Sequence, residues 1–216
     1  MGYFSSNRAI YGLRQQIKYH YNINSGKYFL FCFCAIVGCA LGLFAAFNAP
    51  YEYVLVYSSL PVFQTNFFLL TTGQITLTSY FIANVFNASV VFIAIFLLGW
   101  TIYTIPILFV IVGYRGYAIA YDSVMLIAHL GTSGIVNLII IVLPINILVL
   151  LMFISGSVAS LNRCILLRNT ASLSGTECGI PFFVKRILLV FALTVAIYLV
   201  EMFIIFVLLF SVGAVL

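Results

Sequence analysis

Residues 84–163 read NVFNASVVFIAIFLLGWTIYTIPILFVIVGYRGYAIAYDSVMLIAHLGTSGIVNLIIIVLPINILVLLMFISGSVASLNR. Before the closing Arg163, this stretch contains two charged residues, Arg115 and Asp122, among long runs of Ile, Leu, Val, Phe and Ala. An apolar run of 18 or more residues with few charges is typical of a membrane-spanning helix. The stretch is long enough for several such helices, so it predicts the centre of a membrane protein.

The composition of the whole chain indicates the same class. Of 216 residues, 65% are hydrophobic and 6% are charged, which is too little polar surface to cover a soluble domain. The net charge of +5 does not indicate nucleic-acid binding, because the basic residues form two clusters that flank apolar segments. We therefore predict an all-α fold, a polytopic transmembrane helical bundle, with the lipid bilayer as its first partner.

The N-terminal segment, residues 1–27, is basic and contains no acid. Its basic residues are Arg8, Arg14, Lys18 and Lys27. Apolar or aromatic residues recur at intervals of three and four between residues 10 and 21, which favours a short amphipathic helix on the cytoplasmic leaflet, attracted by anionic lipid. A poorly ordered basic tail is the alternative.

Residues 28–216 are expected to form a single transmembrane domain with about five spans. We place these spans near residues 28–47, 84–104, 107–131, 134–160 and 187–210. Pro106 then marks one turn between spans, and residues 129–134 mark the next. The second basic cluster consists of Arg163, Arg168, Lys185 and Arg186. Because basic loops stay in the cytoplasm, both clusters predict a cytoplasmic N-terminus and a C-terminus outside.

Residues 48–80 lack Lys and Arg, and Glu52 is their one charge, so this loop is expected outside. Whether residues 54–70 enter the membrane stays open, because Pro61 and several polar residues interrupt them. In the first span, Gly38 and Gly42 form a small-xxx-small pair that predicts a helix-packing face. The three cysteines of that span are interpreted as small hydrophobic residues rather than metal ligands.

Five polar residues of the predicted spans form a candidate site, which we call the intramembrane polar seam. Its members are Arg115, Asp122, His129, Asn146 and Glu201. The first three recur every seven residues, close to two helical turns, so they share one helix face. Asp122, Asn146 and Glu201 are expected roughly halfway through their spans. The seam either binds a ligand or conducts protons, or it joins the helices through hydrogen bonds, which we favour.

Enzymatic chemistry has little support in the sequence. The chain contains no HExxH, no GxSxG and no phosphate-binding glycine loop, and its two histidines, His20 and His129, are over a hundred residues apart. We predict no catalytic residue, no metal site and no cofactor, and no contact with nucleic acid.

Several short motifs resemble the stage II sporulation protein M family of integral membrane proteins. They are NVFN at 84–87, IAIFLLG at 93–99, IPIL at 105–108, GYRGY at 113–117, LPIN at 143–146 and SGS at 155–157. The family-motif residues are Asn84, Asn87, Gly99, Pro106, Gly113, Gly116 and Pro144. The similarity covers roughly residues 80–165, and the ends of the chain match the family in hydropathy alone.

The resemblance implies a five-span protein of the bacterial cytoplasmic membrane without enzymatic activity of its own. In one branch of the family such a protein is a scaffold for peptidoglycan-degrading envelope partners during sporulation. In another branch it accompanies bacteriocin and peptide gene clusters for secretion or immunity, often beside a separate ABC-type ATPase. The scaffold would dock its partners on the outer loop, and the exporter would dock the ATPase on its cytoplasmic basic residues. A homo-oligomer is left open.

Overall fold

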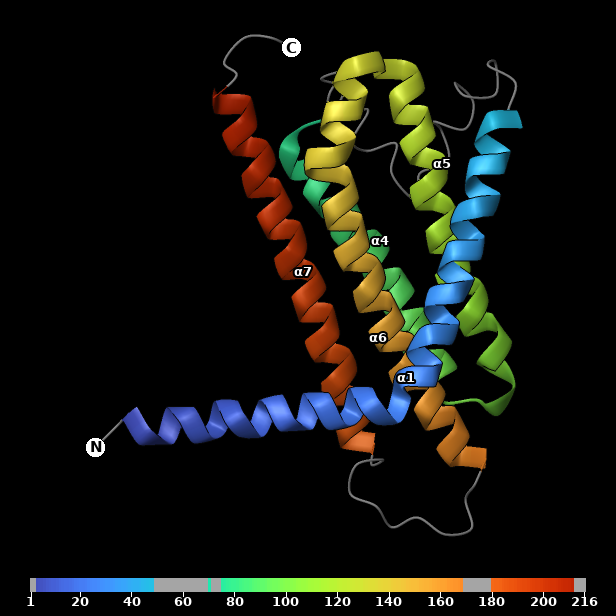
Figure 1. The fold of residues 1–216 in the computed structure, drawn as a ribbon, viewed down its shortest axis with the longest axis vertical. Helices are drawn as coiled ribbons and strands as arrows, with labels where there is room; N and C mark the ends of the chain where they lie inside the picture. The colour runs from blue at the N-terminus through green and yellow to red at the C-terminus, as the bar shows by residue number, and fades with distance from the viewer. Residues whose placement is uncertain (1–2, 49–69, 71–74, 169–179, 212–216) are drawn as a thin grey trace.

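In a computed structural model, five long helices stand side by side and the N-terminal part of the first lies crosswise to them (Figure 1). The structure describes residues 3–48, 70, 75–168 and 180–211. Within that part, five segments are long and apolar enough to cross a membrane. They are Asn22–Asn48, Leu77–Leu98, Ile105–Ala128, Gly131–Leu166 and Pro181–Val207. Since these residues include no strand, the predicted all-α polytopic bundle is confirmed.

Helix α1, Tyr3–Asn48, combines the N-terminal segment with the first span. Its first part extends sideways from the end of the bundle where α7, Ile180–Ser211, begins, and its second part runs along the bundle (Figure 1). A helix is therefore present over the segment that the sequence analysis assigned to the membrane surface. The side chains of residues 1–21 lie outside the described part, so the amphipathic face remains a prediction.

Helix α4, Leu77–Leu98, begins earlier than the expected start near residue 84. Thr76 caps it, because its Oγ1 accepts a hydrogen bond of 3.2 Å from the backbone N–H of Ser79. The apolar pattern alone did not reveal this cap. Glu52 and residues 54–69 of the preceding loop lie outside the described residues. Whether this loop enters the membrane therefore stays open.

The chain reverses after α4 through residues 99–104, including the short 3₁₀ helix η1, Ile102–Thr104. Pro106 is not in the turn, where we expected it, but in the first turn of α5, Ile105–Asn137. The first N–H groups of a helix have no partner within the helix, so proline loses no hydrogen bond there. Proline thus marks the start of the helix that follows the turn.

The second reversal occurs at Gly131, within the turn predicted for residues 129–134. Gly131 has φ 57°, which glycine adopts readily, and it lies at a sharp kink inside α5. The part of α5 after the kink belongs to the arm that returns along the bundle (Figure 1). A π-helical turn, η2, Leu138–Val142, then leads into α6, Leu143–Arg168. Pro144 is the second residue of α6. Because proline has no N–H, it cannot donate the regular helical hydrogen bond to a carbonyl oxygen of the π-helical turn.

Helices α1 and α5 touch backbone to backbone. A Cβ atom added to Gly38 would collide with the carbonyl oxygen of Gly113, and one added to Gly42 would collide with that of Tyr117. From the other helix, a Cβ on Gly116 would collide with the carbonyl oxygen of Ala35. Small residues allow this approach in membrane helices, so the packing face predicted from Gly38 and Gly42 is confirmed.

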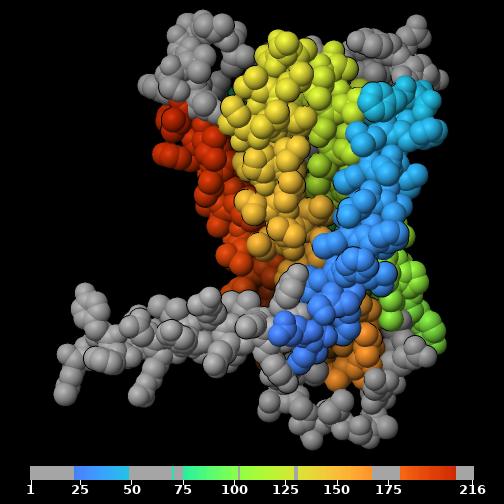
Figure 2. All heavy atoms as spheres, in the orientation of Figure 1, coloured from blue at the N-terminus to red at the C-terminus, as the bar shows by residue number. Residues whose placement is uncertain are grey.

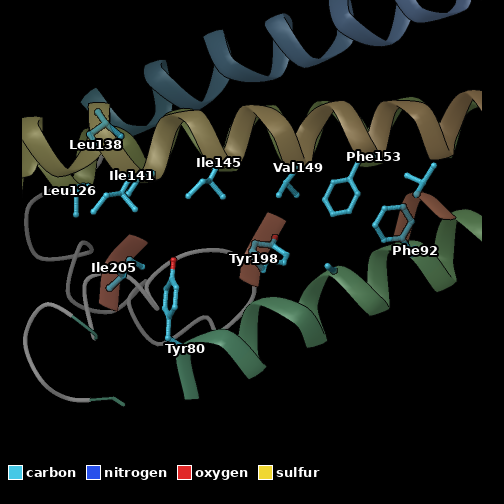
Figure 3. Packing of buried hydrophobic residues seen from close by; sticks show 13 residues of the cluster. Tyr80, Phe92, Leu126, Leu138, Ile141, Ile145, Val149, Phe153, Tyr198 and Ile205 are labelled. Carbon is cyan, nitrogen blue, oxygen red and sulfur yellow. The ribbon is translucent and has the colours of Figure 1, made fainter. Parts of the chain in front are cut away.

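Apolar side chains fill the bundle in two clusters. One joins α4, α6 and α7 around Phe92, Val149, Phe153 and Tyr198, and Figure 3 shows these side chains facing one another. The other joins α1 to α5, α6 and α7 around Phe31, whose ring stacks on Phe109 at 4.5 Å between centroids. Figure 2 shows the spans packed side by side. Large apolar side chains are exposed along them, as expected for helices that face lipid.

Labelling of single cysteines tests the predicted orientation. Tyr103, in η1, is 93% exposed, and Thr132, beside Gly131, is exposed at the other end of the bundle. We expect a membrane-impermeant thiol reagent, added outside intact cells, to modify Thr132→Cys and to leave Tyr103→Cys unmodified until the cells are opened. The unsubstituted chain controls for its native cysteines. The reverse pattern would place the N-terminus outside.

Candidate intramembrane polar site

The seam has its positive charge on α5. Arg115 is 6% exposed, and its Nη2 donates a hydrogen bond of 3.0 Å to Oδ1 of Asn146 on α6. Asn146 in turn donates through Nδ2 to the carbonyl oxygen of Val142 at 2.7 Å, in the π-helical turn. The Arg115 guanidinium also lies 5.6 Å from the centre of the Phe153 ring, a favourable cation–π distance. These contacts join α5 to α6.

The seam has one of its acids on α7. Glu201 is 3% exposed, and its Oε1 accepts a hydrogen bond of 2.7 Å from the hydroxyl of Tyr80 on α4. Figure 3 shows Tyr80 reaching from α4 toward α7, between Ile205 and Tyr198. Asn84 lies one turn further along α4, on the same helix face as Tyr80. The hydrogen bond from Tyr80 to Glu201 joins α4 to α7.

Arg115 lies within electrostatic range of both acids, Asp122 and Glu201, and against the hydroxyl of Tyr198. The structure thus brings Arg115, Asn146 and Glu201 to neighbouring positions from three helices. Asp122 is partly buried, and its Oδ2 has no hydrogen-bond partner among the described residues. The side chain of His129 lies outside the described part. Opposite charges and hydrogen bonds at this depth stabilise contacts between helices.

The depth of Glu201 differs from the expectation. It pairs with Tyr80, which follows the first residue of α4 by three positions, and it is twenty-one residues from the start of α7. Glu201 therefore lies toward the end of the bundle that is remote from the crosswise part of α1, and not halfway through its span. The expectation placed the start of this span at residue 187, whereas the helix begins at Ile180.

Two tyrosines of this site escaped the sequence analysis. Tyr80 precedes Asn84 by four residues and Tyr198 precedes Glu201 by three, so each shares a helix face with a polar residue already noted. This spacing was the available signal. It was missed because the chain contains 14 tyrosines, so neither residue stood out in the sequence.

The family-motif residues occupy close contacts and helix starts. Gly113 and Gly116 lie in the α1–α5 contact, and a Cβ on Gly99 would come within 2.6 Å of Cζ of Phe183 and 3.2 Å of Oγ of Ser160. Asn84 and Asn87 are partly buried on α4, and Pro106 and Pro144 lie in the first turns of α5 and α6. Close packing thus accounts for the three glycines of the motif, and the starts of two helices account for its two prolines.

The basic residues gather at one end of the bundle, which we call the basic end and define by residues 22–28, 99–105, 160–166 and 181–187. Arg163 lies 5.7 Å from the centre of the Trp100 ring, and Arg186 donates to the hydroxyl of Tyr28 at 3.4 Å. Lys185 is exposed. The side chains of Arg8, Arg14, Lys18 and Arg168 lie outside the described part. Apart from Arg115, the described cations therefore lie on several helices that meet there.

A cleft of about 200 Å³ opens between α4, α5 and α6. Its walls are apolar or aromatic except for Arg115, which lies in its lining. In the described part of the chain, no three His, Cys, Asp or Glu side chains come close enough to hold a metal ion. The polar groups of the site mainly contact one another across helix boundaries, and this arrangement stabilises a particular packing of the bundle.

The five apolar helices and the buried polar contacts between them define a multi-pass integral membrane protein. Comparison of the chain with protein-family models, curated proteins and solved structures gave no match.

Loss of the Tyr80 hydroxyl tests the contact between α4 and α7. We expect Tyr80→Phe to lower the free energy of unfolding by about 0.6 kcal/mol, the average for hydrogen bonds between membrane helices. The matched control is Tyr103→Phe, which removes a hydroxyl from a 93% exposed ring at the basic end. Unfolding in mixed micelles, followed by circular dichroism, measures both variants. Equal stability of the two would argue against the Tyr80–Glu201 hydrogen bond.

Proposed function

We propose that this chain is a non-enzymatic scaffold of the bacterial cytoplasmic membrane that anchors partner proteins of a cell-envelope complex. The observation that carries the proposal is the pairing of the intramembrane polar groups with one another, Tyr80 with Glu201 and Arg115 with Asn146. Such pairing favours a fixed helical bundle over a water-filled pathway through the bundle. The resemblance to the stage II sporulation protein M family supplies the class of partner, namely peptidoglycan-degrading proteins.

A fixed bundle suits an anchor because its outer surface is constant. Exposed apolar side chains lie along the spans, among them Phe203 on α7 and Phe86 on α4, at 66% and 67% exposure. Lipid covers such side chains readily, and so does the apolar membrane anchor of a partner. The helices of the partner would then lie beside the spans, and its wall-degrading domain would stand outside the membrane.

A permease-like subunit of an ABC-type export or immunity system is the second candidate. The observation that favours it is the basic end, where the exposed Tyr103 lies on the short helix η1, and the exposed Lys185 and the crosswise part of α1 lie nearby. A short helix between two spans offers a separate ATPase chain a compact surface to contact. The transported molecule would be a peptide or a bacteriocin.

Isolation of the tagged protein from its native host in mild detergent tests both candidates. Co-purification of wall-degrading enzymes supports the scaffold, and co-purification of an ABC-type ATPase supports the exporter. Two variants with single exposed substitutions locate the contact. Tyr103→Ala alters the basic end, and Thr132→Ala alters the opposite end. The scaffold predicts that Tyr103→Ala retains its partners, whereas the exporter predicts loss of the ATPase in Tyr103→Ala alone.

The acids of the seam test a third role, a proton- or ion-coupled carrier. Under the scaffold proposal, Asp122→Asn and Glu201→Gln retain the same partners as the parent chain at every pH, because neither acid needs to release a proton. Reconstituted vesicles that hold each variant are compared with the parent for proton flux, measured with a pH-sensitive dye inside. Flux in the parent that both variants lack would replace the scaffold with a carrier.

A further inference from the structure

The cleft of about 200 Å³ between α4, α5 and α6 is lined by residues of the described part of the chain. They are Val91 on α4, Val110, Ile111, Tyr114 and Arg115 on α5, and Phe153 on α6. The surface that these residues turn into the cleft is apolar. Arg115 therefore lines it with the methylene groups of its side chain, while its guanidinium donates to Asn146. The cleft thus offers apolar contact to an occupant.

The cleft extends from the outside of the bundle toward its core. Val110 and Tyr114, about one helical turn apart on α5, are 66% and 49% exposed and form its mouth. Phe153 is 2% exposed and forms its floor, where its ring packs edge-on against Phe92 at 5.0 Å between centroids (Figure 3). An occupant therefore enters from the side of the bundle, the side that faces lipid.

The cleft also lies at the depth of the hydrocarbon core. Arg115 follows the first residue of α5 by ten positions, about 15 Å along the helix, and Val91 precedes the last residue of α4 by seven positions, about 10 Å. Both residues belong to segments that are long and apolar enough to cross a membrane. Because each leaflet contributes about 15 Å to the hydrocarbon core, these depths correspond to the distal half of an acyl chain.

An acyl chain suits this space better than water or a helix of another protein. Water requires polar partners, and apolar cavities of about 150 Å³ stay dry and accept apolar molecules. A helix with its side chains is about 10–12 Å wide, too wide to enter a cleft of this volume, whereas a hydrocarbon chain is one carbon wide. We infer that the cleft between α4, α5 and α6 binds the distal half of a phospholipid acyl chain, which lies against the ring of Phe153.

Carbene labelling of the full-length protein in vesicles tests this inference. The vesicles contain phosphatidylcholine and a small fraction of the same lipid with a diazirine near the end of one acyl chain. Light converts the diazirine into a carbene that inserts into adjacent C–H bonds. Mass spectrometry then measures the labelled fraction at Phe153 and at Leu151, a 47% exposed residue of the same helix that surrounding lipid can reach. We expect both residues to be labelled, and labelling at Phe153 to be lost when the diazirine lies beside the ester group instead.

Two variants that fill the cleft distinguish it from the general lipid-facing surface. Val91→Phe and Ile111→Phe each add a ring to the lining. We expect each to lower labelling at Phe153 by about tenfold relative to Leu151, because each methylene group excluded from an apolar site weakens binding about fourfold. Val90→Phe is the matched control, since it makes the same change at the adjacent, 51% exposed residue of α4 and should retain the parent labelling.

The parent chain alone can overturn the inference. Phe153 that stays unlabelled while Leu151 is labelled would do so, and so would equal labelling of Phe153 from the two diazirine positions. Among the variants, parent-level labelling of Phe153 in both Val91→Phe and Ile111→Phe would also overturn it. An unchanged circular dichroism spectrum and unchanged labelling at Leu151 establish that a variant is folded in the membrane.

Discussion

Gly38→Val is expected to force α1 away from α5 and to lower the free energy of unfolding by about 3 kcal/mol, at the upper end of the usual cost of overpacking. Even a Cβ atom at this position collides with the carbonyl oxygen of Gly113. Backbone atoms cannot move aside as a flexible side chain can, so the helices must separate. Separation would also disturb the contacts of Gly42 and Gly116 in the same interface.

The control for this prediction is Gly26→Val, on the same helix. Apart from the adjoining backbone of its own helix, nothing lies within 4 Å of a Cβ built on Gly26, so this variant shares the change in helix propensity and lacks the collision. Unfolding of both variants by a denaturing detergent in mixed micelles, followed by circular dichroism, gives the comparison. If Gly38→Val unfolds at the same denaturant fraction as Gly26→Val, the close contact between α1 and α5 is refuted.

Arg115→Leu is expected to destabilise the protein by about 3 kcal/mol, the scale for removal of one member of a buried charged contact. The substitution removes the hydrogen bond to Asn146 and a cation that interacts electrostatically with both Asp122 and Glu201. It leaves the Asn146 oxygen without its donor in an apolar environment, where an unpaired polar group is costly.

The same unfolding measurement distinguishes charge from shape. Arg115→Lys keeps the charge and is expected to recover part of the loss, since lysine supplies fewer donors than the guanidinium. Lys185→Leu, which removes an exposed cation from the basic end, should change stability little. An Arg115→Leu variant as stable as Lys185→Leu would show that the seam contributes no stability, and would favour a functional role for Arg115 over a structural one.

The spans could be predicted from the sequence because length and hydropathy are local properties. A helix of about 20 apolar residues is required by the thickness of the bilayer, whatever its neighbours are. The turn at Gly131 could be predicted for the same reason, since it depends on the backbone nearby, whereas Pro106 lies in the first turn of α5 and not in the turn before it. The start of α4 was not visible, because Thr76 is one of several threonines before the span, and its role depends on the geometry of one turn.

The polar contacts could be predicted only in part. Arg115 and Asn146 stand out in apolar surroundings, and hydrogen bonding between helices was the favoured interpretation for the seam. Which residues meet depends on the order and rotation of the helices, which a single sequence does not specify. The hydrogen bond from Tyr80 to Glu201 joins residues 121 positions apart. To predict this hydrogen bond, one must know that α4 lies beside α7.

The glycine contact between α1 and α5 has a mechanical consequence. Most packed helices are separated by side chains that rotate and absorb small displacements, whereas Gly38 and Gly42 bring two backbones into direct contact. Helices α1 and α5 should therefore move as one rigid lever. The span of α1 that contacts α5 continues from the crosswise part at the basic end (Figure 1). Because α5 contains Arg115, a displacement of this span should move the buried charge with it.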